Sequence, residues 1–395
     1  MTGRSPDVVV VGGGIVGTAT AAFLAAAGAD VLLVEAEAIA AGASGRNSGV
    51  VQHPLDATLA ALHRETISLY RALEVESDGA FSLGTEPAGL LYVSLDGDVA
   101  ARLAAGLAST HPELSPALVA GRALESLEPS LAPGVAACRL AIGFPVAPAS
   151  ATRAYAAVAE RYGARVRVGA AASLVRHNGR VAGVSIASEV VAAGAVVVAA
   201  GPWTPATIDP TGRWVRIHSL WGAVVEVTLE APPRHVLEEA EIDGAIEPAA
   251  GDRGAAAEPE PSPTVQVVSF SLVTAAGRSV VGSTFLDAEP DPAALAPTIV
   301  ARGAKFVPGI ATARVASHRC CARPLSFDGR PLVGPVPGIE NLFVAAGHGP
   351  WGISTGPATA RLVADLALMR PTDVPVALSP DRFPAPPALP RAGDN

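Results

Sequence analysis

One short stretch decides the fold of this chain: Val8-Val9-Val10-Val11-Gly12-Gly13-Gly14-Ile15-Val16-Gly17. Its four valines are β-branched and apolar, a composition typical of a strand buried on both faces of a parallel sheet. The glycines follow at once, and the alanine-rich residues 18–27 then predict a helix that ends at Gly28. Residues 31–34 predict a second buried strand, which ends at Glu35. The stretch therefore opens a β-α-β unit of about 30 residues.

The glycines have the spacing Gly12-x-Gly14-x-x-Gly17 between the predicted strand and the predicted helix. The first permits a tight turn, the second lets a pyrophosphate approach the backbone, and the third lets the helix pack close to the strand. The pyrophosphate then lies at the helix N-terminus, where free amides and the helix dipole favour an anion. The Glu35 carboxylate can accept hydrogen bonds from a ribose diol, and it repels the 2′-phosphate of NADP. The pattern predicts a bound dinucleotide other than NADP.

A second loop, Gly42-Ala43-Ser44-Gly45-Arg46-Asn47-Ser48-Gly49, follows the second strand. It offers hydroxyl, amide and backbone donors. Such a loop suits an extended cofactor whose pyrophosphate and ribityl chain need contacts beyond the first turn, which favours FAD over NAD. The alternative is a solvated linker.

Apolar periodicity predicts the remaining elements. The dipeptide Asn178-Gly179 predicts a hairpin between strands at 173–176 and 181–186. Residues 247–264, rich in proline, alanine, glycine and glutamate, predict an exposed, mobile loop, and the tail beyond Pro371 is expected to be peripheral. Helices are expected at 56–76, within 98–126, at 151–162, up to 307 and at about 357–369, and further strands at 89–93, 165–168, 195–200, 223–228, 265–273, 279–285 and 341–346.

Composition narrows the class of protein. A chain of 395 residues, half of them apolar and 16% charged, is long enough for two domains. The net charge of −9 and the absence of a basic stripe argue against a nucleic-acid partner. Three cysteines do not have the spacing of a disulfide framework or a zinc site, so no metal is expected. No stretch has the pattern of a transmembrane segment or a signal peptide, which predicts a cytoplasmic protein.

Four stretches together resemble the family of FAD-dependent oxidoreductases that includes D-amino acid oxidase, glycine oxidase, monomeric sarcosine oxidase and D-amino acid dehydrogenase. They are residues 8–35, the loop 42–49, residues 196–203, and residues 323–356. The last contains Arg-Pro-Leu-Ser-Phe-Asp-Gly-Arg-Pro-Leu-Val-Gly-Pro and, further on, Ala-Ala-Gly-His-Gly-Pro-Trp-Gly-Ile-Ser-Thr-Gly. The resemblance runs from about residue 7 to 370, with the same order and spacing.

The resemblance implies an α/β plus α+β fold: a Rossmann-like FAD-binding domain and a second, mainly antiparallel-sheet substrate domain. The FAD-binding domain is expected to be discontinuous, from 1–78, 143–215 and 318–375. The substrate domain would comprise 79–142 and 216–317, and residues 376–395 a peripheral tail.

The resemblance also assigns site residues. Arg323 is expected to hold a substrate carboxylate through two parallel hydrogen bonds; the alternative is an arginine that caps its strand. His348 lies in a loop expected beside the flavin, where it either takes part in catalysis or fixes the loop. Together with the glycine motif, the resemblance predicts FAD contacts from Gly12, Gly14, Ile15, Val16, Gly17, Glu35, Ala36, Ala43, Ser44, Arg46, Asn47, Ser48, Ala172, Gly201, Trp203, Cys321, Gly347, Gly349, Gly352 and Ile353.

Several positions depart from the family pattern. The chain has no tyrosine after Tyr162 to act as a second carboxylate partner, and Phe270 is the comparable strand position. Val280 stands where sarcosine oxidases carry a lysine that assists reaction with oxygen. Cys321 has the position of a cysteine that attaches FAD covalently in monomeric sarcosine oxidases, although it can equally be a core residue. Arg46 replaces the histidine that other relatives use for attachment.

The resulting prediction is an FAD-dependent enzyme that oxidises the C–N bond of a small amino or imino acid of the glycine, D-amino acid or sarcosine type. Hydride passes from the α-carbon to flavin N5, and the imine hydrolyses to an oxo acid. One alternative is a 2-hydroxy acid oxidoreductase, with His348 or His53 as the base. Another is an electron-transfer subunit of a larger dehydrogenase complex. Oxygen, a quinone or another electron carrier is the expected acceptor, and self-association into a homo-oligomer stays open.

Overall fold

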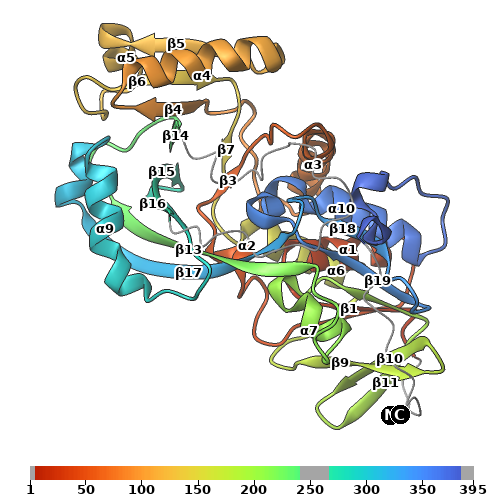
Figure 1. Ribbon diagram of the computed structural model, residues 1–395. Helices are drawn as coiled ribbons and strands as arrows, with labels where there is room; N and C mark the ends of the chain where they lie inside the picture. The colour runs from red at the N-terminus through yellow and green to blue at the C-terminus, as the bar shows by residue number, and fades with distance from the viewer. Residues whose placement is uncertain (1–4, 241–266, 384–395) are drawn as a thin grey trace, which may run out of the picture.

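The computed structural model describes residues 5–240 and 267–383, and it has two lobes, each built on its own sheet (Figure 1). The predicted loop 247–264 and the end of the tail lie outside the described residues. The first lobe contains a six-stranded sheet, parallel except for its outermost strand. Its strands are, in spatial order, β18 (Leu332–Pro335), β19 (Leu342–Ala346), β12 (Ala195–Val198), β1 (Val8–Val11), β2 (Val31–Val34) and β8 (Arg165–Arg167).

Both faces of the six-stranded sheet are covered, which explains its continuous apolar strands. Every residue of β1, β2 and β12 is buried. One face packs against α1 (Ile15–Ala26), α3 (Ala57–Glu76), α6 (Ser150–Arg161) and α10 (Gly352–Ala367). The other packs against a small antiparallel sheet of β9 (Ala172–His177), β10 (Arg180–Ile186) and β11 (Glu189–Ala192), and against α7 (Thr204–Ile208). The predicted hairpin at Asn178-Gly179 joins β9 to β10.

The second lobe contains an eight-stranded sheet, antiparallel except where β14 pairs with β4. Its strands are, in spatial order, β17 (Arg314–Ser326), β13 (Ile217–Thr228), β16 (Arg278–Phe285), β15 (Val267–Ala275), β14 (Val236–Glu239), β4 (Leu90–Ser94), β6 (Ala136–Leu140) and β5 (Ala117–Ala120). One face packs on α9 (Pro292–Ala304) and α5 (Gly121–Leu127). The opposite face packs partly on α4 (Gly97–Thr110) and partly faces the first lobe. The predicted fold class is thereby confirmed.

The helical stretches predicted within 98–126 are the two helices α4 and α5, separated by the edge strand β5. The helix expected to end near residue 307 is α9, which ends earlier, at Ala304. Residue 318, where the predicted FAD-binding domain resumes, lies inside β17, a continuous strand of the eight-stranded sheet. The tail is held where the structure describes it, because Leu378 is fully buried and Arg382 pairs with Asp328.

The last helix, α10, begins at Gly352, five residues before its predicted start at Pro357. A proline inside a helix leaves the carbonyl four residues earlier without its donor. Here that carbonyl belongs to Ile353, and it accepts a hydrogen bond of 2.7 Å from the buried Tyr70 hydroxyl. Because a tertiary contact replaces the missing bond, the helix extends through Pro357. Its N-terminus therefore lies at the loop that carries His348.

Candidate active site

A cavity of about 730 Å³ is lined by residues of both lobes. At one end its walls come from the carboxyl ends of β1, β2 and β12 and from the loop that contains α2 (Ala43–Arg46). At the other end the wall is the face of the eight-stranded sheet. Parallel α/β sheets bind ligands at the carboxyl ends of their strands. The volume is in the range of small-molecule and cofactor sites, and we take this cavity as the candidate active site.

The turn between β1 and α1 has no room for a side chain at its first and third motif glycines. A Cβ on Gly12, whose φ is +116°, would lie 2.3 Å from the Ala199 carbonyl oxygen. One on Gly17 would lie 1.8 Å from the carbonyl oxygen of Gly12 itself. A Cβ on Gly14 would instead point at the Ser44 hydroxyl, 3.1 Å away, on the cavity side. The first and third glycines thus close the turn, and the second leaves the backbone open to a ligand.

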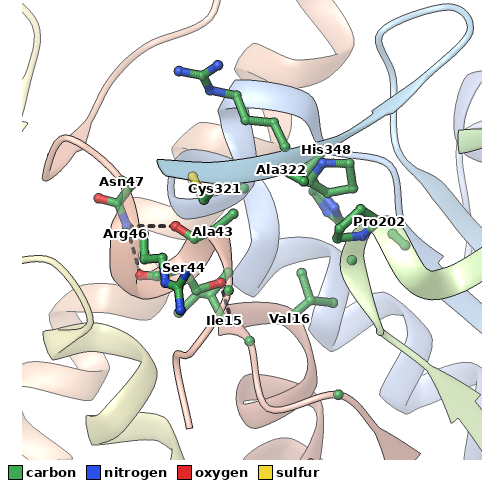
Figure 2. A pocket seen from close by; sticks show the side chains of 18 of the residues that line it. Ile15, Val16, Ala43, Ser44, Arg46, Asn47, Pro202, Cys321, Ala322 and His348 are labelled. Atoms are coloured by element: carbon green, nitrogen blue, oxygen red, sulfur yellow. Dashed lines mark hydrogen bonds between the residues drawn. The ribbon is translucent and has the colours of Figure 1, made fainter. Parts of the chain in front are cut away.

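The N-terminus of α1 is available to an anion, because Gly14 caps it without a side chain. The Ile15 amide donates to the Ser44 hydroxyl at 2.9 Å (Figure 2). Glu35 is held beside the same turn, since its carboxylate accepts from the amides of Gly13 (2.6 Å) and Glu37 (2.8 Å). The turn therefore offers backbone amides and the Ser44 hydroxyl to a pyrophosphate. Beside them lies the Glu35 carboxylate, which can accept hydrogen bonds from a ribose diol.

The loop 42–49 is ordered by Asn47 rather than being a solvated linker. Its side-chain amide donates to the carbonyls of Ser44 (2.7 Å) and Ala43 (3.3 Å), as Figure 2 shows, and its Oδ1 accepts from the Gly49 amide at 2.8 Å. These bonds fix the short helix α2, so that Ser44 lies at the α1 N-terminus. Arg46, in the same loop, lines the cavity where it meets β17.

Arg323, on β17, is the cation that the eight-stranded sheet contributes to the cavity wall. Its guanidinium donates to the Thr284 carbonyl at 2.9 Å and to the Ser283 hydroxyl at 2.8 Å. It lies across β13 because residue 222 is glycine: a Cβ there would be 2.3 Å from the guanidinium. The Phe285 ring lies beneath it, 4.8 Å away.

No acidic neighbour in the described part of the chain neutralises the charge of Arg323. Among residues 5–240 and 267–383, no carboxylate forms an ion pair with it, and burial lowers its pKa. Both of its hydrogen-bond acceptors are neutral. A guanidinium in such a position stabilises an incoming carboxylate strongly, because the pair forms away from bulk water. The geometry does not support a strand-capping role, since its bonds go to β16, two strands away.

His348 lines the cavity but is only 2% exposed. Its Nε2 lies 2.8 Å from the Thr359 hydroxyl, which itself donates to the Gly356 carbonyl. Because that hydroxyl hydrogen is already used, His348 donates through Nε2 and is the Nε2-protonated tautomer. Burial lowers its pKa to about 3, so the ring is neutral at ordinary pH. These contacts attach the loop to α10, and a neutral ring of this pKa is a weak base.

Cys321 lines the cavity two residues before Arg323. The thiol is buried, and burial raises its pKa above the ordinary value. A protonated thiol is a poor nucleophile. The environment therefore gives no activation for covalent attachment, and it suits a packing residue.

Most of the predicted site residues meet in this one cavity, and a few do not. Gly17 lies outside the lining, where it closes the turn as described, and Gly347, with φ +91°, turns the chain before His348. Phe270 was the wrong strand position: it faces the opposite side of the sheet and stacks on Phe306 with ring centroids 4.8 Å apart. The lining includes Gly12, Gly14, Ile15, Val16, Glu35, Ala36, Ala43, Ser44, Arg46, Asn47, Ser48, Ala172, Gly201, Trp203, Cys321, Arg323, His348, Gly349, Gly352 and Ile353, whereas Val280 and His53 are not part of it.

Sequence reasoning missed the polar groups that the second sheet directs into the cavity. They are single polar residues within apolar strands, which is a weak signal that local pattern does contain. The strand register places Glu238 opposite Ser271, on one face of the sheet, and Ser283 of β16 also lines the cavity. They are Glu238, Ser271 and Ser283, together with Gln52 of the first lobe.

The profile of a family described as FAD dependent oxidoreductase matches residues 7–366. The chain belongs to this family. An uncharacterized oxidoreductase of Bacillus subtilis (strain 168), YurR, is 26% identical over 93% of this chain and 96% of its own length. A glycine oxidase of Pseudomonas putida is 30% identical over 49% of this chain and 46% of its own length. A D-amino acid dehydrogenase of Methylobacterium nodulans is 30% identical over 56% and 48%. The chain thus spans about half the length of the last two relatives.

Solved structures share the fold over nearly the whole chain. The glycine oxidase of Geobacillus kaustophilus superposes with a TM-score of 0.78 at 23% identity, covering 96% of this chain and 99% of that one. The L-proline dehydrogenase of P. horikoshii gives 0.78 at 18% identity, covering 96% and 98%. At these identities the likeness establishes the fold.

The protein is accordingly an FAD-dependent oxidoreductase, and the cavity fits that cofactor. It has a glycine turn that a Cβ would fill, helix amides for a pyrophosphate and Glu35 for a ribose. The cavity then continues between the lobes to the loop before α10. The N-terminal amides of α10 can stabilise the negative charge that a flavin ring carries when it is reduced. No helix in the described part of the chain is both long and apolar enough to cross a lipid bilayer.

Proposed function

We propose that the protein oxidises the C–N bond of a small amino or imino acid, giving an imine that water converts to an oxo acid. The observation that supports this most directly is Arg323, a cation without an acidic partner in the described chain, in the wall of the cofactor cavity. A bidentate guanidinium fixes both the position and the direction of a substrate carboxylate. Relatives named glycine oxidase and D-amino acid dehydrogenase agree with this substrate class.

Bound FAD supplies the hydride acceptor, and the chain supplies orientation and a dry site. Ser283 and the Thr284 carbonyl hold the Arg323 fork in place, and Arg323 holds the substrate acid group. The substrate loses one hydride from the α-carbon and one proton from nitrogen. An amine that binds neutral needs no strong base, which agrees with a neutral His348.

The 2-hydroxy acid alternative loses support from the same geometry. Oxidising an alcohol requires a base for the hydroxyl proton. Burial holds the pKa of His348 near 3, and His53 lies outside the cavity lining, in contact with His63. Neither histidine is suited to that role.

The test is anaerobic flavin reduction. The purified holoenzyme is mixed with a panel of glycine, sarcosine, proline, D- and L-amino acids and matched 2-hydroxy acids, and flavin bleaching is followed. We expect reduction by at least one amine and by no hydroxy acid. Reduction by hydroxy acids alone would overturn the proposal. Admitting oxygen or a quinone to the reduced enzyme then identifies the acceptor. Acid precipitation should release the yellow colour to the supernatant, because the pKa of the Cys321 thiol is raised.

A further inference from the structure

Arg319, on β17, joins the eight-stranded sheet to the cofactor loop 42–49. Its Nη2 donates to the carbonyl of Asn47 at 3.0 Å, and its Nε donates to the carbonyl of Arg46 at 3.3 Å. The two carbonyls are consecutive along the chain, so one planar guanidinium serves both of them. The short helix α2 of this loop lies beside β17 where the two lobes meet (Figure 1). These bonds therefore connect the lobes directly at the cofactor loop.

Glu226 fixes the direction of the Arg319 side chain. It lies on the neighbouring strand β13, and its Oε2 accepts from Arg319 Nη1 at 3.2 Å. Its other oxygen accepts from Arg278. Because Glu226 neutralises its charge and it lies outside the cavity lining, Arg319 is unsuited to bind a phosphate or a substrate acid group. Its contacts instead tie a loop of the first lobe to the sheet of the second.

The same face of β17 carries Arg323. Side chains alternate along a strand, so Arg319, Cys321 and Arg323 share one face, and the last two line the cavity. Four residues of an extended strand separate the backbone of Arg319 from that of Arg323 by about 13 Å. The strand thereby sets the distance from the loop that contacts the cofactor to the side chain proposed to hold the substrate.

Beyond Arg323, β17 has a second attachment to the first lobe. Leu325 pairs with His348 in an isolated bridge. The strand is therefore held to the first lobe at two places, at Arg319 and at Leu325, with Arg323 between them. Two separate attachments fix the orientation of a strand, whereas one leaves it free to pivot.

We propose that Arg319 is a positioning residue, which sets the flavin ring against a substrate held by Arg323. This rests on the proposed function, in which Arg323 binds the substrate carboxylate. A displacement of about 1 Å between reacting groups can lower a rate roughly a hundredfold, even when its cause is remote from the chemistry. Removing Arg319 should therefore slow flavin reduction more than it weakens the binding of cofactor or substrate.

The loop itself should stay folded without Arg319. Its bond to the Ile15 amide and its internal bonds from the Asn47 side chain do not involve that arginine. The loss is in its attachment to the sheet. The remaining link, from the Arg46 side chain to the Cys320 carbonyl, is 3.5 Å long and weak at that distance.

The attachment can be tested without turnover. Hydrogen exchange of the peptide covering residues 42–49 is measured by mass spectrometry in the full-length apoprotein. The amides of Gly45 and Gly49 are bonded within the loop and report its opening. In Arg319→Met we expect them to exchange about tenfold faster or more, because opening no longer breaks two bonds from a charged donor. Arg314→Met, at an exposed position of the same strand, is the control and should exchange like wild type.

Turnover supplies the second readout. The holoenzyme is reduced anaerobically by the amino acid that the screen identifies, and the rate constant is followed as a function of its concentration. In Arg319→Met the limiting rate constant should fall about tenfold or more, while the dissociation constant of the amino acid changes by less than about threefold. Arg319→Lys keeps a charge beside Glu226 but cannot hold two carbonyls in one plane, so it should recover only part of the rate. The lysine variant also carries the test if the methionine variant does not hold FAD.

The two proposals fail in different ways. If only 2-hydroxy acids reduce the flavin, the proposed function fails, and Arg319 is tested with those acids, whose carboxylate Arg323 can hold in the same way. If the loop exchanges like wild type in both Arg319 variants, the attachment is refuted. If it exchanges faster while the limiting rate constant stays within about threefold of wild type, Arg319 is merely structural and the positioning role is refuted.

Discussion

Replacing Arg323 with methionine separates the cost of the arginine to folding from its value to the substrate. Methionine has a similar length and no charge. The same change at Arg314, an exposed residue of the same strand, is the matched control. If Arg323 exists to bind a carboxylate, the variant should lose activity without losing stability.

The magnitudes follow from its surroundings. For folding, removal of the guanidinium relieves a desolvation cost of up to several kcal/mol. It also forfeits two hydrogen bonds, to Ser283 and to the Thr284 carbonyl, each worth about 1.5–3 kcal/mol with a charged donor. These terms offset each other, so the free energy of unfolding should change by no more than about 2 kcal/mol. For the substrate, losing one partner of a desolvated charge pair costs about 2–5 kcal/mol. That is roughly a thirtyfold to several-thousandfold fall in kcat/KM.

The assay pairs urea unfolding of the holoenzyme with steady-state kinetics on whichever amino acid the screen identifies. Arg314→Met should be close to wild type in both. A fall in stability of more than about 4 kcal/mol with kcat/KM retained in the folded fraction would show that Arg323 is structural. The corresponding amine without a carboxyl group offers a further check, since its turnover should respond little to the substitution.

Two further predictions concern the cofactor turn and a buried histidine. Gly17→Ala places a Cβ 1.8 Å from the Gly12 carbonyl oxygen. Because overpacking costs about 1–3 kcal/mol, FAD binding should weaken roughly fivefold to 150-fold in a fluorescence titration of the apoprotein. The control variant Gly106→Ala, whose Cβ meets no atom within 4 Å, should bind FAD normally. Burial lowers the pKa of His63 from 6.5 to about 4, so the unfolded chain takes up a proton between these values that the folded protein does not. The free energy of unfolding should therefore decrease as the pH is lowered through this window, by up to about 1.4 kcal/mol per pH unit. His63→Gln should remove that part of the slope in unfolding titrations, and an unchanged slope would argue against a role for His63 in it.

The parts of the fold that sequence predicted well are those fixed by local chemistry. Four consecutive valines indicate a strand covered on both faces, and Gly17 can be recognised because its Cβ would meet the Gly12 carbonyl oxygen within the same turn. Asn178-Gly179 joins its hairpin for the same reason. Pro357 misled the prediction because the donor that replaces its missing bond, Tyr70, is far away in sequence.

The candidate site was predictable on the side formed by the motifs and not on the side formed by the second sheet. Arg323 was expected through a resemblance, but its acceptors on β16 depend on strand pairing between distant segments. Glu238 enters the cavity because β14 pairs with β15 and, in parallel, with β4, from residues 90–94. Nothing in the sequence around Glu238 specifies that pairing. A one-residue slip would turn the side chain to the opposite face.

The bond from the Ile15 amide to the Ser44 hydroxyl has a consequence for the order of assembly. A helix start without a partner destabilises the chain that contains it. Because the hydroxyl satisfies this amide, the first lobe does not need a cofactor to give the Ile15 amide a partner. A phosphate that arrives later exchanges with a neutral hydroxyl instead of ordering a disordered loop. Loading should then resemble docking to a finished receptor, and its rate should depend on cofactor concentration without a slow folding phase.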